Sequence, residues 1–236
     1  MNQRSVTRGL LMRNCNKVWA AAFILVAFAP SRAVAQLESP CAANSPERRG
    51  EYGCSLVEIK ALPAGLAGPL AWHIDRFKSL PAAQAAVGPT SIALEAHGGW
   101  WLLTVEPTTT NHHGGEHVTE VQLPPLPPAA KYAMLVISAY IPAGQFSRFH
   151  LHSGVEAFYT VDGEQCLETA TRTYSIPKGS TAVVATGEIM RLVSMGTVPR
   201  RNFAVVVYDA TQPPTTRLES APALASCNPK SPGGGE

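Results

Sequence analysis

The sequence predicts an all-β exported protein whose C-terminal half forms a barrel or sandwich. Short runs of strand-forming residues follow one another there, separated by turn residues about every 8–12 positions. The 236-residue chain has 20 prolines and only 15% charged residues, which favours a turn-rich β protein over a helical bundle. One strand-like run carries His150 and His152, which share a face because alternate side chains of a strand point the same way.

The first 35 residues predict a secretory signal peptide. Four basic residues precede an apolar run over 18–29, and the small-x-small sequence at 33–35 is typical of a signal-peptidase site. The apolar run is shorter than the roughly 20 residues that a bilayer span needs, so we expect no stable membrane span after cleavage. A retained anchor is the alternative. The mature chain, 36–236, is then expected to be periplasmic or secreted.

Cysteine usage agrees with export. Outside the predicted signal peptide the cysteines are Cys41, Cys54, Cys166 and Cys227, an even number that suits an oxidising compartment. Four cysteines allow three pairings, and the sequence does not choose between them. Proximity favours Cys41–Cys54, which leaves Cys166–Cys227 to tie the C-terminal tail to the barrel.

The charge of the mature chain argues against a nucleic-acid partner. The formal net charge is +2 and falls to −3 once the five basic residues within 1–35 are removed. No cluster of lysine and arginine with interleaved aromatic residues remains, and such a cluster is the usual footprint of nucleic-acid binding. We expect a small-molecule ligand instead.

The N-terminal part of the mature chain is expected to extend the barrel. Residues 36–54 are polar and are predicted to form an exposed leader. Residues 55–116 are expected to pack on the barrel. Pro81 suits a first helical turn and Gly88-Pro89 ends it, which predicts one short helix over 80–87. The remaining segments predict strands or apolar runs at 56–59, 70–77, 90–96 and 100–105, the last two joined by a hairpin turn at Gly98-Gly99.

Residues 117–212 are expected to form the barrel itself. A mostly buried strand at 131–141 follows a stiff proline-rich connector at 124–128. Shorter strand-like runs, most of them bounded by proline or glycine, follow at 164–170, 173–176, 181–185, 190–194 and 202–208. Residues 213–236 are rich in Pro, Ser, Thr and Gly and are expected to form a flexible tail.

Two segments of the barrel carry fixed residues at regular spacing. The first reads Gly144-x5-His150-x-His152-x3-Glu156-x6-Gly163, and the second reads Gly179-x5-Ala185-x-Gly187-x2-Met190-x3-Ser194. The first fits every fixed position of the first motif of the cupin superfamily. The second resembles the second motif, whose last positions are usually proline, glycine, histidine and asparagine. The resemblance covers roughly 118–210 and implies a cupin-type double-stranded β-helix, or jelly-roll, barrel.

The resemblance also implies a metal site formed by His150, His152 and Glu156. Two imidazoles and a carboxylate suit Fe, Mn, Zn or Ni and leave coordination positions open. Met190 falls where the second motif usually supplies its third histidine, so it would be the fourth position. A thioether is a poor ligand for Fe or Mn but acceptable for Cu(I), which keeps copper among the candidates. The alternative is that Met190 is an apolar wall of the pocket.

Alternation extends the expected pocket beyond the metal ligands. Residues that should share a face with the ligands or with Met190 are Phe146, Arg148, Phe158, Thr160 and Leu192. An inward Arg148 would clamp an anionic substrate. The alternatives are that a bulge turns Arg148 outward or that it pairs with an internal acid such as Glu188.

These observations lead to two functional hypotheses. The first is an exported cupin-domain protein with a divalent metal in the barrel mouth, and the sequence leaves open whether it is an enzyme. Metal-dependent dioxygenase-, isomerase- or lyase-like chemistry on a small anionic or oxygenated molecule would be the enzymatic form. The second is a non-enzymatic, small-molecule-binding cupin that lacks a catalytic metal. The resemblance further implies a homodimer, because cupins commonly pair edge strands.

Overall fold

The structure is a computed structural model that describes residues 53–66, 68–108, 114–220 and 225–227. The predicted signal peptide and Cys41 lie outside the described residues. Within them there are fourteen strands and one short helix, all strand pairs being antiparallel. The protein is therefore nearly all-β, as the sequence predicts. In the described part of the chain, no helix has the length and apolar character needed to cross a membrane.

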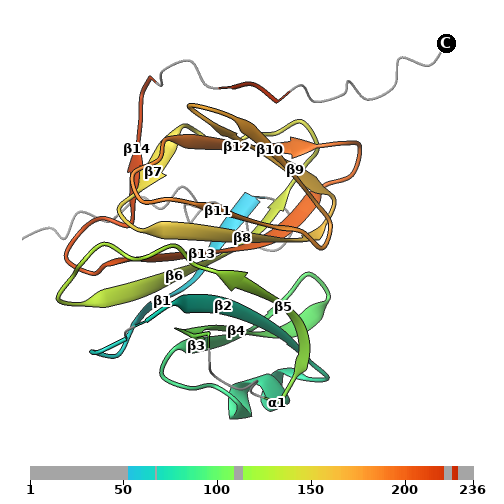
Figure 1. The fold of residues 1–236 in the computed structure, drawn as a ribbon. Helices are drawn as coiled ribbons and strands as arrows, with labels where there is room; N and C mark the ends of the chain where they lie inside the picture. The colour runs from blue at the N-terminus through green and yellow to red at the C-terminus, as the bar shows by residue number, and fades with distance from the viewer. Residues whose placement is uncertain (1–52, 67, 109–113, 221–224, 228–236) are drawn as a thin grey trace, which may run out of the picture. The chain divides into compact units, whose positions relative to one another are not determined.

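Two five-stranded sheets face each other and form the barrel (Figure 1). The first has the order β1 (Gly53–Ala61), β6 (Tyr132–Ile141), β13 (Arg200–Asp209), β8 (Val155–Asp162) and β11 (Thr181–Val184). The second has the order β10 (Thr173–Pro177), β9 (Glu164–Thr169), β12 (Met190–Met195), β7 (His150–His152) and β14 (Thr215–Arg217). From β6 onward the chain crosses repeatedly between the two sheets, which is the winding of a cupin-type double-stranded β-helix.

The barrel interior is an apolar core with contributions from both sheets. Phe158 of β8 and Val206 of β13 pack in the same buried cluster as Leu167 of β9 and Ile176 of β10. The alternation of each strand places these residues inside and sends their neighbours to the outer face. The apolar stretches at the second motif therefore line the interior of the barrel.

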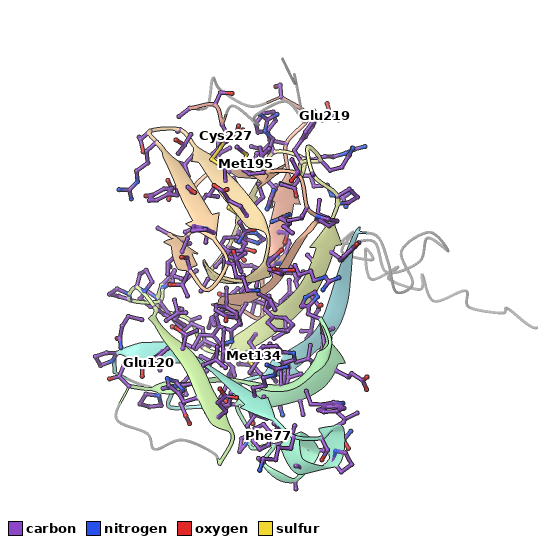
Figure 2. The ribbon with its side chains drawn as sticks, turned by 90° about the vertical axis from the view of Figure 1, so that its right-hand side faces the viewer. Phe77, Glu120, Met134, Met195, Glu219 and Cys227 are labelled. Atoms are coloured by element: carbon purple, nitrogen blue, oxygen red, sulfur yellow. A yellow bond between two sulfur atoms is a disulfide. The ribbon has the colours of Figure 1, made fainter. Side chains whose placement is uncertain are left out.

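A third sheet covers the outer face of the first one. Its order is β3 (Ser91–Ala96), β4 (Gly99–Pro107), β2 (Leu70–Phe77) and β5 (Glu116–Gln122), with α1 (Leu80–Ala85) packed on it. Trp72 and Leu103 of this sheet share a buried cluster with Phe203 and Val205 of β13. Figure 2 shows Met134, from the same cluster, where the barrel meets the smaller sheet. The first sheet is thus buried on both faces, which explains the continuous apolar run of β13.

The pairing of strands does not follow the boundary expected between the N-terminal extension, 55–116, and the barrel, 117–212. β1, from the N-terminal range, pairs with β6 of the barrel from Gly53 to Ala61. β5, at the start of the expected barrel range, pairs with β2 of the smaller sheet instead. An apolar pattern identifies a strand but does not name its partner, because partner choice depends on contacts distant in sequence.

The short helix and the hairpin form close to where the sequence predicts them. The side chain of Ser79 caps α1 by accepting a hydrogen bond from the Ala82 amide at 3.3 Å. The β3–β4 turn is shifted by one residue from the predicted Gly98-Gly99: its two central residues are His97 (φ 52°) and Gly98 (φ 72°). Positive φ at both positions is the signature of a type I′ turn.

Cys166 and Cys227 form a disulfide, which is the pairing that remains if proximity joins Cys41 to Cys54. Both are buried beside Val193 and Met195 on the outer face of the second sheet (Figure 2). The bond fixes the segment after β14 to the barrel. The backbone amide of Cys227 also donates to Glu168 Oε1 at 2.7 Å.

Candidate metal centre

Three side chains from two consecutive strands, one in each of the facing sheets, form one buried cluster inside the barrel. His150 and His152 come from β7, and Glu156 comes from β8 after the turn at Ser153-Gly154. They are 3%, 2% and 3% exposed, and one ligand atom from each lies within 4.8 Å of the others. The residues that the first motif singles out are therefore together in space and could hold a metal ion.

The turn between the two strands depends on Gly154. A Cβ at this position would lie 2.0 Å from the carbonyl oxygen of Val207 on β13. No side chain fits there, so only glycine lets the chain pass against β13 and bring Glu156 back beside the histidines. Gly154 is not one of the motif glycines.

Backbone carbonyl groups fix the orientation of both imidazoles. Nδ1 of His150 lies 2.7 Å from the carbonyl oxygen of Arg148, and Nδ1 of His152 lies 2.9 Å from that of Pro214. A carbonyl only accepts, so in each ring Nδ1 carries the proton and donates it. In the neutral ring the lone pair is then on Nε2, which is how metal-binding histidines are usually oriented.

The facing atoms of His152 and Glu156 need a positive charge between them. His152 Nε2 and Glu156 Oε2 are 3.0 Å apart, are both buried, and have no other hydrogen-bond partner. If His152 is neutral, two lone pairs face each other, which is unfavourable without a proton or a metal ion. Two ligands that each lie about 2.1 Å from a metal are themselves about 3 to 3.5 Å apart, so this pair fits a cation.

The protonation equilibria of the two histidines differ. Burial lowers the pKa of His150, and the neighbouring His152 lowers it further. Burial also opposes charge on His152, but the Glu156 carboxylate more than offsets this and raises the pKa of His152 above its ordinary value. A proton is consequently the competitor of a metal ion at the His152–Glu156 pair.

Met190 lies next to this cluster. It is directly opposite His150 in the β7–β12 pairing and is fully buried. It also packs in the apolar cluster of the barrel interior with Leu192, Phe158 and their neighbours. The structure therefore places Met190 beside the candidate metal centre and within the apolar wall.

Among the predicted pocket residues, Phe158, Thr160 and Leu192 face the barrel interior. All three are buried, and the Thr160 hydroxyl donates to the Ile176 carbonyl at 3.1 Å. Phe146 is 63% exposed, its ring lying against the Arg191 guanidinium at 4.9 Å. Arg148 is also exposed.

A one-residue shift of register explains why Phe146 and Arg148 face outward. Phe146 pairs with Val193 and His150 pairs with Met190, so four residues on one side correspond to three on the other. The extra residue reverses the alternation before β7 begins. The prediction that Phe146 and Arg148 line the pocket with the histidines is therefore wrong, and the bulge alternative is the one observed.

A different arginine occupies the barrel interior. Arg200 at the start of β13 is 3% exposed, and its guanidinium donates to Gln165 Oε1. Gln165 in turn donates to Thr160 Oγ1 at 3.0 Å, while Arg200 Nε is buried without a hydrogen-bond partner. Burial lowers the pKa of Arg200 to about 10, and the Glu156 carboxylate raises it. Arg200 pairs with no carboxylate of the described residues.

The sequence pattern is consistent with an interior Arg200, although Arg200 is not among the pocket residues predicted from the sequence. Positions 200, 202, 204, 206 and 208 alternate along one strand and all face the interior. The strand was predicted to begin at Asn202, which left Arg200 in the preceding turn. The strand begins at Arg200 because its pairing with β6 continues to Ile141.

The fold is a cupin-type jelly-roll barrel, and its interior contains a buried His-His-Glu cluster. No family model and no curated protein matches this sequence. Solved structures do match part of it. A cupin-like protein from Thermotoga maritima is 10% identical over 37% of this chain and 64% of its own chain, with a TM-score of 0.32.

Two enzymes are among the matched structures. Oxalate oxidase in complex with the substrate analogue glycolate is 18% identical over 37% of this chain and 46% of its own, with a TM-score of 0.30. Salicylate 1,2-dioxygenase from Pseudoaminobacter salicylatoxidans, in complex with gentisate, is 16% identical over 31% of this chain and 20% of its own, with a TM-score of 0.29. In each case the chain spans less than two thirds of the matched structure.

Proposed function

We propose that this protein binds one divalent metal ion through His150, His152 and Glu156 and uses the site on a small anionic or oxygenated molecule. The observation that carries the proposal is the 3.0 Å approach of His152 Nε2 to Glu156 Oε2. Both atoms are buried without other partners, and the Nδ1 atoms of both histidines are occupied by backbone carbonyls. These features support a cation at this point.

The donor set favours Fe, Mn, Zn or Ni, because imidazole nitrogen and carboxylate oxygen suit these ions. Three protein ligands would leave positions open for water or substrate, and the metal would supply Lewis acidity or activate dioxygen. Met190 would serve as the fourth ligand only with Cu(I), since a thioether is a soft donor. With the other metals, Met190 acts as an apolar wall beside His150.

Arg200 supports an anionic ligand. A buried guanidinium normally has a carboxylate or phosphate partner, because an isolated charge is costly to bury. Here the hydrogen-bond partner of the Arg200 guanidinium is the neutral amide of Gln165. An anionic group entering the barrel would complete the pairing. We therefore assign substrate recognition to Arg200 instead of Arg148.

The second candidate is a non-enzymatic protein that captures a small molecule, with a structural ion or none. The near-complete burial of His150, His152 and Glu156 favours it, because a catalytic site must admit its substrate. Both candidates include export and a signal peptide at 1–35. The Cys166–Cys227 disulfide supports an oxidising compartment.

The experiment is metal analysis of the full-length expressed protein, purified without a histidine tag from the periplasmic fraction. We expect one metal ion per chain after exposure to Fe, Mn, Zn, Ni or Cu, and at least a tenfold loss of affinity in Glu156→Gln. His97→Asn, which changes a histidine on the smaller sheet, is the matched control and should bind as the unmodified chain does. No binding of any of the five metals, or equal binding by Glu156→Gln, would refute the proposal.

Arg200→Met tests the substrate part separately. Methionine removes the charge and fills part of the same volume, but it leaves the buried Gln165 Oε1 without its donor. We expect metal content to stay unchanged and the free energy of unfolding to fall by about 1–3 kcal/mol, so that the variant remains folded for the binding measurement. Binding of a small carboxylate such as glycolate to the metal-loaded protein, measured calorimetrically, should weaken at least tenfold. Unchanged carboxylate binding would contradict the role of Arg200.

A further inference from the structure

A cleft separate from the candidate metal centre lies where the smaller sheet meets the barrel. Its volume is about 370 Å³, within the range of roughly 300–1,000 Å³ found for small-molecule sites. Residues of β2, β4 and β5 line one side, and residues of β8 and β13 line the other. Two of the lining residues on β8, Tyr159 and Val161, belong to the outer face of that strand, opposite to the face that carries Glu156.

Three cationic side chains from distant parts of the chain converge on this cleft. Arg76 comes from β2, Lys178 from the turn after β10, and Arg201 from β13. Both Arg76 and Lys178 are close enough to Tyr159 to favour its ionised form, although burial raises the pKa of Tyr159 overall. The three cations outnumber the two carboxylates of the lining, Glu116 and Asp162, so the cleft has a net positive charge.

Two of the three cations have no acidic partner. Lys178 pairs with Asp162 at 3.3 Å at the exposed edge of the cleft. Arg76 and Arg201 form no ion pair with any carboxylate among the described residues. Glu116 also lines the cleft and lies opposite Arg76 in the strand pairing, yet the two side chains do not pair. Two guanidinium groups are thus available to an external anion.

Aromatic rings hold these arginines in place. The Arg76 guanidinium lies over the Trp101 ring at 5.6 Å from its centroid, and that of Arg201 lies over Tyr140 at 5.3 Å. Gly99 makes room for the first of these contacts, since a Cβ there would lie 3.0 Å from Trp101 Nε1 and 3.3 Å from Arg76 Nε. Stacked guanidinium groups lose less freedom on binding, because their orientation is already restricted.

The β3–β4 hairpin closes the cleft by docking on the barrel. The ring of His97, at the tip of the hairpin, lies 4.9 Å from the Phe203 ring. Its Nε2 lies 3.1 Å from Ser138 Oγ and 3.3 Å from the Asn202 carbonyl oxygen, so it bridges two barrel strands. The hairpin therefore attaches the smaller sheet to the barrel beside the cleft.

We infer that this cleft is a binding site for a small oxyanion-bearing molecule, one that carries a carboxylate or a phosphate group. Arg76 and Arg201 would each donate a pair of hydrogen bonds, because the guanidinium fork matches both kinds of oxyanion. Lys178 would add a third contact at the edge, and the Tyr159 phenol would face the bound molecule. The site is independent of the metal centre, since it uses the opposite face of β8.

Calorimetric titration of the full-length expressed protein with inorganic phosphate and, in a second arm, with succinate tests the inference. We expect saturable binding of at least one probe, and each of Arg76→Gln and Arg201→Gln should weaken it at least tenfold. Binding of phosphate alone supports a phosphate-bearing ligand, and binding of succinate alone supports a carboxylate. His150→Ala should bind the same probe as the unmodified chain does, which separates this site from the metal centre.

The matched control is Arg172→Gln. Arg172 also stacks on an aromatic ring, that of Tyr174 at 4.4 Å, but it lies on the barrel away from the cleft. Its substitution should leave binding unchanged, and circular dichroism should show that all four variants are folded. Two results overturn the inference: neither probe binds, or Arg76→Gln and Arg201→Gln bind the probe as well as Arg172→Gln does.

Discussion

Removing the Cys166–Cys227 disulfide should cost the protein about 4 kcal/mol of stability. The cysteines are 61 residues apart in sequence. Closing a loop of that length reduces the entropy of the unfolded chain by an amount that corresponds to about 4 kcal/mol at room temperature. Because typical domains are stable by only about 5–15 kcal/mol, the loss would be a large part of the total.

Equilibrium unfolding in urea, followed by tryptophan fluorescence, measures this loss. The unmodified protein would be compared with Cys166→Ala/Cys227→Ala and with the same unmodified protein under reducing conditions. Reduction keeps the sulfur atoms, and in a Cys41→Ala/Cys54→Ala background it breaks only this bond, so it isolates the effect of the covalent bond from that of the buried atoms. We expect both to unfold at clearly lower urea. A difference of less than about 1 kcal/mol between oxidised and reduced protein would refute the loop-closure reasoning.

Three further predictions follow from single residues. Gly154→Ala should destabilise the fold by about 3 kcal/mol, because the added Cβ would lie 2.0 Å from a backbone carbonyl oxygen. Gly88→Ala is the control: its added Cβ would have its nearest neighbour at 3.6 Å, so this variant should be nearly neutral in the same urea experiment. Burial lowers the pKa of His97 to about 4, so the folded state binds fewer protons than the unfolded state. The free energy of unfolding should therefore fall by at most about 3 kcal/mol as the pH drops from about 6.5 towards 4. In His97→Asn, whose asparagine tolerates the positive φ, this fall should be shallower. Parallel profiles of stability against pH for the two proteins would contradict the prediction. Met190→His should increase metal affinity in a competition titration, because position 190 lies opposite His150. Unchanged affinity would show that the side chain at position 190 does not reach the ion.

The sequence predicts much of the barrel because its turns are marked locally. The fixed glycines at 144, 163, 179 and 187 all have positive φ, a conformation that other residues rarely adopt, so they are direct signals of turns. Strand geometry alone predicts that His150 and His152 share a face, the first motif adds Glu156 from the next strand, and the structure brings the three together.

What could not be predicted depends on contacts between distant segments. The outward turn of Phe146 and Arg148 results from one extra residue relative to β12, and a strand does not reveal its own register without its partner. The interior position of Arg200 depends on how far β13 continues along β6. The cleft with Arg76 and Arg201 requires the smaller sheet to dock on the barrel, so no single stretch of sequence contains it.

The hydrogen bond between His152 Nδ1 and the Pro214 carbonyl has a thermodynamic consequence. Pro214 precedes β14, which pairs with β7 from His150 to His152, so the C-terminal segment takes part in orienting a candidate ligand. If a metal binds more tightly when this segment is docked, linkage requires that the metal hold the segment in place by the same factor. Protease susceptibility near residue 213 should then report occupancy of a site that lies inside the barrel. By the same reciprocity, a partner that bound the C-terminal segment in its undocked form would lower the affinity of the site for the metal.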